Sequence, residues 1–381
     1  MGEVFDLKNG YTPSKSVKEY WENGSIPWFR MEDIRENGRI LDSALQQISE
    51  SAIKGGKLFP ANSIIMATSA TIGEHALITV PFLANQRFTN LSLKPEFTDK
   101  FNIYFLYYYC FNLSDWCKKN TTTSSFASVD MNGFKRFPIP IPPLETQQKI
   151  VKILDKFTEL EATLEAELAL RKRQYRYYRD FLLDFDNQIG GGIVNGYKGR
   201  LKDVVWKTLG EVVPISRGKR LVRSQLQDNG QYPVYQNSLQ PLGFYDNQNC
   251  RAYMTFVIAA GAAGEIGFSD IEFWAADDCY YFDCPKEILH DKFLYYFLLS
   301  ERHQLTSQIR KASVPRLGRV SIEKIKIPIP PLPEQEKIVA ILDKFDTLTH
   351  SISEGLPREI ALRRKQYEYY REQLLAFPKA A

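Results

Sequence analysis

The sequence predicts a mixed α/β fold in which two globular domains alternate with two long helices, as a pseudo-twofold internal repeat. Three observations lead to this prediction. A proline-rich segment occurs twice, a long run of heptad-spaced apolar residues follows each copy, and 381 residues suffice for two domains with separate cores. The apolar fraction of 44% and the charged fraction of 25% are typical of folded proteins. A net charge of +4 permits a nucleic-acid partner without requiring one.

The repeated segment is the clearest feature of the chain. Residues 139–157 read IPIPPLETQQKIVKILDKF, and residues 327–345 read IPIPPLPEQEKIVAILDKF. Further on, RKRQYRYYR at 171–179 returns as RRKQYEYYR at 363–371, with four additional residues before the second copy. Prolines cannot continue a helix and favour extended geometry in the residue before them. Each proline-rich segment is therefore expected to be a stiff strap that fixes how a helix leaves its domain.

The apolar residues after each strap predict a coiled coil. A narrow, long stripe flanked by charges is typical of a coiled-coil seam, so we expect the two helices to pair antiparallel with each other. At 1.5 Å per residue, a helix of about 40 residues is about 60 Å long. The four additional residues, together with Gly355 and Pro357, predict a break in the second helix. The alternative is two amphipathic helices that pack separately on their own domains. The predicted seam residues are Ile150, Leu154, Phe157, Leu164, Leu168, Tyr175, Tyr178, Leu182 and Phe185, and then Ile338, Leu342, Phe345, Ile352, Leu356, Ile360, Tyr367, Tyr370, Leu374 and Phe377.

The repeat divides the chain into four segments. They are a first globular domain over 1–143, a first helix over 144–186, a linker with a second globular domain over 187–331, and a second helix over 332–381. Within the domains, the β-like runs at 64–73 and 256–267 each end in a turn of small residues. The Tyr- and Phe-rich segments at 101–113 and 293–299 are the expected core helices.

No catalytic constellation is found in the sequence. The four histidines are dispersed and there is no phosphate-binding GxxxxGK[ST] motif, so no metal or cofactor is expected in this chain. The glycines at 261–267 do not have dinucleotide-binding spacing and predict a tight turn. The amino-methyltransferase tetrapeptide is also missing. Five cysteines without a CxxC pair indicate a reduced, cytoplasmic chain, and no apolar run reaches membrane-spanning length.

Clusters of cationic, hydroxyl and amide side chains in predicted loops indicate nucleic-acid binding. Lys, Arg, Ser and Thr contact phosphates, whereas Arg, Asn and Gln also read base edges. For any single cluster, a solvated surface loop is the alternative. Because such clusters occur in both repeats, we favour DNA binding. The candidate residues are Arg30, Lys57, Thr68, Ser69, Arg87, Lys118, Lys119, Asn120, Thr122, Arg217, Lys219, Arg220, Arg223, Gln236, Asn237, Arg310, Lys311, Arg316 and Arg319.

The two straps with their ILDKF helices resemble the specificity subunits of type I restriction–modification systems, and the helix endings resemble the type IC group. This resemblance implies two target-recognition domains, each reading half of a split, asymmetric double-stranded DNA sequence. It implies that the helices act as a ruler and as the docking site for modification subunits, two copies being expected. S-adenosylmethionine is then bound by those partners, and ATP and Mg by restriction subunits that associate indirectly. No membrane partner is implied.

The sequence departs from the family pattern at one point. The first domain starts at Gly2, whereas the second is preceded by 206–209, so we expect a short N-terminal lead to be missing. Two other functions are weighed against DNA recognition. One is a coiled-coil scaffold that bridges partners without reading DNA. The other is a methyltransferase or nuclease in its own right, which the missing motifs disfavour.

Overall fold

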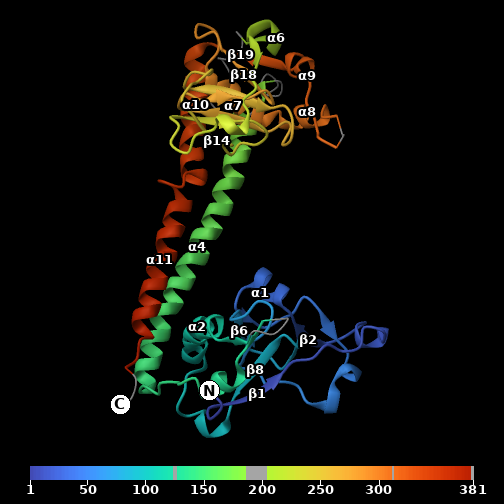
Figure 1. Cartoon of the computed structure of the whole chain (residues 1–381), viewed down its shortest axis with the longest axis vertical. Helices are drawn as coiled ribbons and strands as arrows, with labels where there is room; N and C mark the ends of the chain where they lie inside the picture. Colours follow the sequence, from blue (N-terminus) through green and yellow to red (C-terminus); the bar gives the residue numbers. More distant parts are fainter. Residues whose placement is uncertain (123–126, 186–203, 311–312, 379–381) are drawn as a thin grey trace, which may run out of the picture. The chain divides into compact units, whose positions relative to one another are not determined.

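The computed structural model describes residues 1–122, 127–185, 204–310 and 313–378 (Figure 1). The predicted linker lies largely outside these residues. By its internal contacts the chain divides into two compact units, Met1–Thr163 with Ala361–Ala381, and Leu164–Ile360. Each unit contains one globular domain and a part of each long helix, and each is described by itself.

The globular domain of the first unit is built on a five-stranded sheet in the order β1-β8-β5-β6-β3. A smaller sheet, β4-β2-β7, and the hairpin β9-β10 complete it, and α2 packs against the large sheet (Figure 1). Its helices and strands are β1 (Phe5–Asn9), β2 (Ile26–Phe29), α1 (Met31–Asn37), β3 (Ile40–Leu41), β4 (Gln47–Ile48), β5 (Ser63–Ala67), β6 (His75–Ile78), β7 (Leu83–Ala84), β8 (Phe88–Leu93), α2 (Ile103–Lys119), β9 (Thr121–Thr122), β10 (Ser128–Val129) and α3 (Met131–Arg136).

The second unit repeats this plan. Its main sheet has the order β12-β18-β15-β16, its smaller sheet is β14-β13-β17, and β11 pairs with β19. Its helices and strands are β11 (Val205–Thr208), α6 (Leu209–Val212), β12 (Ile215–Arg217), β13 (Tyr232–Tyr235), β14 (Gly243–Tyr245), β15 (Met254–Ile258), β16 (Ile266–Ser269), β17 (Trp274–Ala275), β18 (Cys279–Phe282), α7 (Asp291–Ser300), α8 (Arg302–Ser307), α9 (Arg319–Glu323) and β19 (Lys326–Ile329).

Both domains mix parallel and antiparallel pairing in the same way. The main sheets are mostly antiparallel, whereas β2 runs parallel to β7, and β13 runs parallel to β17. The predicted mixed α/β fold in two copies is therefore confirmed. The expected core helices are confirmed as α2 and α7, which carry the buried Tyr108 and Tyr296. None of the described helices combines the length and hydropathy of a membrane-spanning segment.

The first long helix, α4 (Leu144–Leu183), is continuous, and the second is divided into α10 (Leu332–His350) and α11 (Leu356–Leu374). The predicted break is confirmed. At Gly355 a Cβ atom would lie 2.2 Å from the carbonyl oxygen of Thr347, so only glycine fits this turn. Ile352 was predicted in the seam, which is wrong: it lies in the break and is 84% exposed.

The long helices pack on each other through aromatic rings. In the first unit, Phe157 of α4 stacks on Tyr370 of α11 at 5.5 Å between ring centroids. In the second unit, Tyr178 of α4 stacks on Phe345 of α10 at 5.4 Å. Later residues of α4 thus meet earlier residues of the second helix, which is the predicted antiparallel pairing.

The helix ends do not belong to the seam, and here the coiled-coil prediction is too long. Leu182 and Phe185 are part of the core of the second domain, and Leu374 and Phe377 pack against the core of the first. A domain surface offers more apolar area to a helix end than a single neighbouring helix does. Each of these C-terminal ends packs on the globular domain that the other helix follows, so the alternative of helices packed on their own domains does not describe them. The seam is confined to the middle of the helices.

A buried glutamine fastens each strap to its domain. Gln147 is fully buried, accepts a hydrogen bond from the Asn102 N–H and donates to the carbonyls of Lys100 and Pro142, each at 2.8 Å. The fully buried Gln335 makes the three equivalent bonds in the second domain.

The aspartate of each ILDKF motif accepts a hydrogen bond from a core tyrosine. Tyr108 donates to Asp155 at 2.7 Å, and Tyr296 donates to Asp343 at 2.6 Å. The repeated motif is therefore a joint between helix and domain, and its polar residues are used for that joint.

The two straps differ in their neighbours. In the second unit the strap forms β19 and pairs with β11. In the described part of the first unit the strap has no strand partner. In the first unit the Met1 amino group donates to the Phe137 carbonyl at 2.7 Å. At the equivalent position of the second unit, the Leu209 N–H donates to the Ile325 carbonyl.

Candidate nucleic-acid interface

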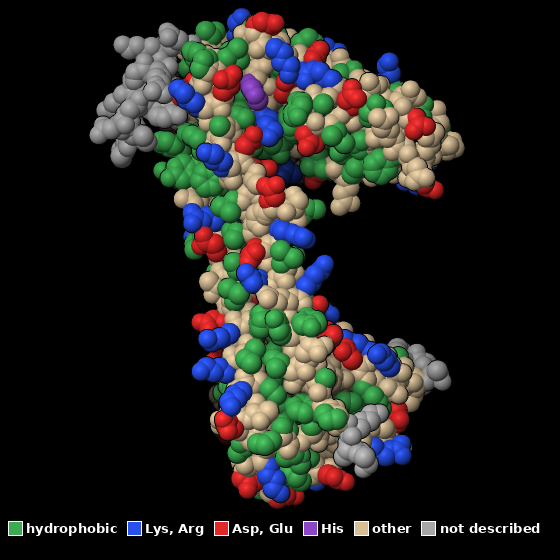
Figure 2. Space-filling model, turned by 90° about the vertical axis from the view of Figure 1, so that its left-hand side faces the viewer, with side chains coloured by type: hydrophobic (Ala, Val, Ile, Leu, Met, Phe, Trp, Pro, Cys, Tyr) green, Lys and Arg blue, Asp and Glu red, His purple; other side chains and the backbone are tan. Residues whose placement is uncertain are grey.

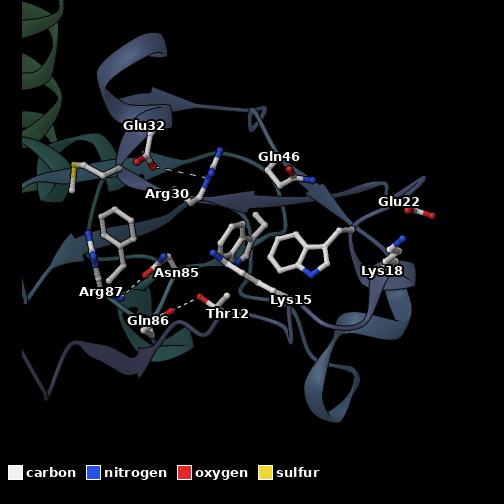
Figure 3. A pocket seen from close by; sticks show the side chains of 14 residues that line it. Thr12, Lys15, Lys18, Glu22, Arg30, Glu32, Gln46, Asn85, Gln86 and Arg87 are labelled. Atoms are coloured by element: carbon white, nitrogen blue, oxygen red, sulfur yellow. Dashed lines mark hydrogen bonds and ion pairs between the residues drawn. The ribbon is translucent and has the colours of Figure 1, made fainter.

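A cleft of about 690 Å³ opens in the first domain where loops beside the small sheet meet (Figure 3). Indole rings and cations line it together with amides, which is a suitable mixture for nucleic acid. The residues lining this cleft are Thr12, Lys15, Lys18, Trp21, Glu22, Trp28, Arg30, Met31, Glu32, Gln46, Asn85, Gln86, Arg87 and Phe88.

Arg30 is placed by the start of α1. The buried Asp33 carboxylate accepts hydrogen bonds from the N–H groups of Arg30 and Leu45, both at 2.6 Å, and so fixes this turn. The guanidinium lies 5.7 Å from the Trp28 ring centroid, and its Nε is 4.0 Å from Glu32 (Figure 3). This Nε is buried and has no hydrogen-bond partner, so Arg30 holds an unsatisfied donor beside the cleft.

Arg87 lies in the turn between β7 and β8. The Asn85 side chain accepts a hydrogen bond from the Arg87 N–H at 2.9 Å, and the Thr12 hydroxyl donates to Gln86 (Figure 3). The turn is therefore ordered from both sides. The Arg87 side chain is exposed and forms no hydrogen bond or ion pair with any described residue.

The predicted hydroxyl residues lie beside this turn. The Thr68 N–H donates to the Arg87 carbonyl at 3.0 Å, and Ser69 forms a bridge with Ser128 in the hairpin β9-β10. In that hairpin the Thr122 hydroxyl lies 2.8 Å from the Ser128 hydroxyl. The structure thus brings Thr68, Ser69 and Thr122 together with Arg87.

In the second domain, Gln236 and Asn237 follow β13. The Asn237 carbonyl accepts from the Ala262 N–H at 2.9 Å, and the Gln236 carbonyl accepts from the Cys279 thiol at 3.2 Å. Burial raises the pKa of the Cys279 thiol, so the thiol remains protonated and is a donor at neutral pH. Both predicted residues are therefore held by backbone contacts, and their side chains remain accessible to solvent.

Four predicted cations gather beside them. Arg310 and Arg316 exchange backbone hydrogen bonds, and Arg316 also forms a bridge with Ala260. The Arg217 side chain donates to the Asp277 carbonyl at 2.7 Å, and the Lys219 N–H donates to the Ala275 carbonyl at 3.0 Å. All four cations therefore adjoin one group of loops.

The remaining predicted residues are not all connected to these surfaces. Lys118 lies against the loop at Gly73 but also forms an ion pair with Asp115 at 3.7 Å, and Arg319 forms one with Glu323 at 2.7 Å. Lys311 lies outside the described residues. The others are Lys57, Lys119, Asn120, Arg220 and Arg223, for which no side-chain contact to either surface is found in the described part of the chain.

Residues at these surfaces that were not among the predicted candidates are Lys15, Lys18, Gln46 and Gln86 in the first domain, and Asp277 and Asp278 in the second. Lys15, Lys18, Gln46 and Gln86 come together only through the fold of the cleft, and the two aspartates fall outside a pattern of cations, hydroxyls and amides. Their position in the chain was the one usable indication. Gln86 lies just before β8 and Asp277 just before β18, and these are the last strands in chain order of the two main sheets.

The described residues contain no group of three or more side chains that could hold a metal. His75 is packed in the core of the first domain, with its ring 4.6 Å from that of Phe111. Burial lowers the pKa of His75 to about 3, so it is neutral and structural.

Figure 2 shows cationic and anionic side chains interspersed over the visible face of the molecule. The positive charge on this face is therefore local, and the face as a whole is not basic.

Comparison with known proteins decides the family. The model of the type I restriction modification DNA specificity domain matches residues 1–170 and 202–362, which include both repeats. The chain belongs to this family. A type I restriction enzyme specificity subunit of Escherichia coli, EcoprrI, is 46% identical over 371 residues, covering 93% of this chain and 88% of that protein. The EcoR124I/EcoR124II specificity subunit of the same species is 36% identical, covering 68% of this chain and 69% of that protein.

Solved structures share the fold. The S subunit of a type I system from M. genitalium aligns with a TM-score of 0.56 at 18% identity, covering 100% of this chain and 95% of that one. A chain described under complex assembly and conformational transition of the type I R-M system aligns with a TM-score of 0.62 at 17% identity, covering 98% and 96%. These structures agree in fold with the family assignment. The family match and the 46% identical relative show that the chain is a DNA-recognition specificity subunit and not a catalytic one, and the scaffold alternative is not favoured.

Proposed function

We propose that this specificity subunit reads a split, asymmetric double-stranded DNA sequence, with one half-site for each globular domain. One observation supports this most. The candidate surfaces of the two domains are formed by equivalent loops, but these loops carry different side chains. Arg30 follows β2 where Gln236 follows β13, and Arg87 precedes β8 where Asp278 precedes β18. Equivalent surfaces with different chemistry fit two unlike half-sites.

The long helices serve as the spacer in this proposal. Helix α4 continues without a break from the first unit into the second, so its length is a fixed quantity. The glutamine and aspartate joints couple each helix to its domain. A fixed helix length then sets the number of base pairs between half-sites.

Two repeated apolar patches would dock the modification subunits. Tyr177 and Leu170 of α4 are 64% and 59% exposed, and Tyr369 and Leu362 of α11 are 59% and 42% exposed. Exposed aromatic residues are enriched at protein interfaces. Because the patches are equivalent in the two repeats, we propose that they bind two copies of one partner.

Catalysis would belong to those partners. S-adenosylmethionine would be bound by the modification subunits, and ATP and Mg by restriction and translocation subunits that associate through them. The assembled complex would act in the cytoplasm, where the host DNA is accessible.

The test is a methylome, namely modified-base sequencing of host DNA with the gene present and deleted. We expect one split, asymmetric motif to lose its methylation on deletion. Repeating the reaction with the purified complex on random-sequence DNA controls for silent expression of the partners. Absence of any motif in both experiments would refute the proposal.

A further inference from the structure

The two domains surround their candidate surfaces with the same backbone hydrogen bonds. In the first domain Gly10 N–H donates to the Phe88 carbonyl, Asn85 to Phe29 and Thr68 to Arg87, at 2.9, 2.9 and 3.0 Å. The equivalent bonds in the second domain run from Gly218 to Cys279, from Ala276 to Tyr235 and from Ala259 to Asp278, at 2.9, 2.8 and 2.6 Å. These matches align residues 85–87 with residues 276–278, and we call these two segments the reading turns.

Steric constraints at both turns are also the same. A Cβ atom on Gly10 would lie 2.2 and 2.4 Å from the carbonyl oxygens of Ala84 and Asn85. One on Gly218 would lie 2.4 and 2.1 Å from the equivalent oxygens of Ala275 and Ala276. Only glycine allows the loop to approach each turn so closely. The backbone of the reading turns is therefore a common frame, and the side chains on it are the variable part.

The chemistry of the two turns is opposite. The first turn carries Asn85, Gln86 and Arg87, whereas the second carries the buried Ala276 followed by Asp277 and Asp278. An arginine only donates hydrogen bonds, and an ionised aspartate only accepts them. Neither the Arg87 guanidinium nor the carboxylates of Asp277 and Asp278 have a hydrogen-bond or ion-pair partner among the described residues, although each is solvent-accessible.

Positive charge in the second domain comes from a different loop. Residues Gly10-Tyr11-Thr12 of the first domain align with Gly218-Lys219-Arg220, as shown by the bonds from Tyr11 to Ala84 and from Lys219 to Ala275. Cations are thus retained beside an acidic turn. Carboxylates repel phosphates, so two unpaired acids on a DNA-binding surface favour contact with donor groups on base edges.

We propose that the reading turns determine base specificity, an inference that rests on the proposed DNA recognition. Arg87 would donate to the O6 and N7 acceptors of a guanine in the first half-site. Asp277 and Asp278 would accept from the amino group of a base in the second half-site, cytosine N4 being the donor that carboxylates match best. The two half-sites then differ because one common turn carries donors in one domain and acceptors in the other.

The experiment uses the full chain assembled with its modification subunits and sequences the motif that each complex methylates. Arg87→Gln should reduce discrimination at one position of one half-site by about 5- to 150-fold, as for loss of one bidentate base contact. Asp278→Asn, with Asp277→Asn as a second variant, should do so at one position of the other half-site. Each variant should leave the opposite half-site unchanged.

Matched controls use solvent-accessible residues of the same charge outside the turns. Arg136→Gln in the first domain and Glu287→Gln in the second should leave the motif intact, since both are exposed and have no described partner. An unchanged motif in the turn variants would overturn the inference. So would a uniform loss of methylation over all sequences, which indicates phosphate contacts. A wild-type complex without any split motif would instead refute the proposed function itself.

Discussion

At the residue scale, the buried glutamines carry the clearest consequence for stability. Replacing Gln147 by Leu leaves one N–H and two carbonyl groups without partners inside the first domain. We expect the free energy of unfolding to fall by about 2–4 kcal/mol, because an unsatisfied buried polar group costs about 1–3 kcal/mol and the strap relaxes in part. Chemical denaturation of the full chain measures this.

The neighbouring Gln148 is exposed and supplies the matched control. Gln148→Leu should change stability by no more than about 0.5 kcal/mol. Equal effects of the two substitutions would contradict the assignment of Gln147 as the joint. The sequence showed that this motif repeats, but it did not show that its glutamine is buried, because Gln147 and Gln148 are chemically identical and differ only in which face of α4 they occupy.

At the element scale, α4 is the proposed spacer. Removing four residues from 158–168 shortens a helix by about 6 Å, which is at most about two base pairs of DNA. We expect the spacer between half-sites to become shorter and both half-site sequences to remain, as measured on the methylome of the variant complex.

Four alanine substitutions in the same stretch keep the helix length and are the control, for which the spacer should not change. An altered half-site in the deletion variant would contradict the role of α4 as a spacer. The heptad pattern predicted this helix well, since α4 starts at Leu144 as the strap ends. The pattern could not separate seam from domain core, because Phe157 and Leu182 are both apolar and only their neighbours differ.

At the scale of the whole molecule, the duplicated patches predict stoichiometry. Tyr177→Ser and Tyr369→Ser should each yield a complex with one modification subunit, and the double variant should bind none. Each substitution removes an exposed aromatic ring from one of two equivalent surfaces. Native mass spectrometry of the purified complexes gives the count.

Tyr253→Ser is the control, because Tyr253 is 60% exposed and lies on the second globular domain instead of a long helix. That variant should retain two modification subunits. Two bound copies in both single variants would show that docking uses other surfaces.

The sequence by itself determined the duplicated architecture, the two long helices, the break near Gly355 and the family. These features depend on local rules such as proline geometry, helical periodicity and glycine turns, which are written along the chain. Only the tertiary structure decided which loops share a surface. Gln236, Asp278 and Arg316 are far apart in sequence and meet because strand pairing brings their loops together. Specificity depends on that proximity, and no local pattern encodes it.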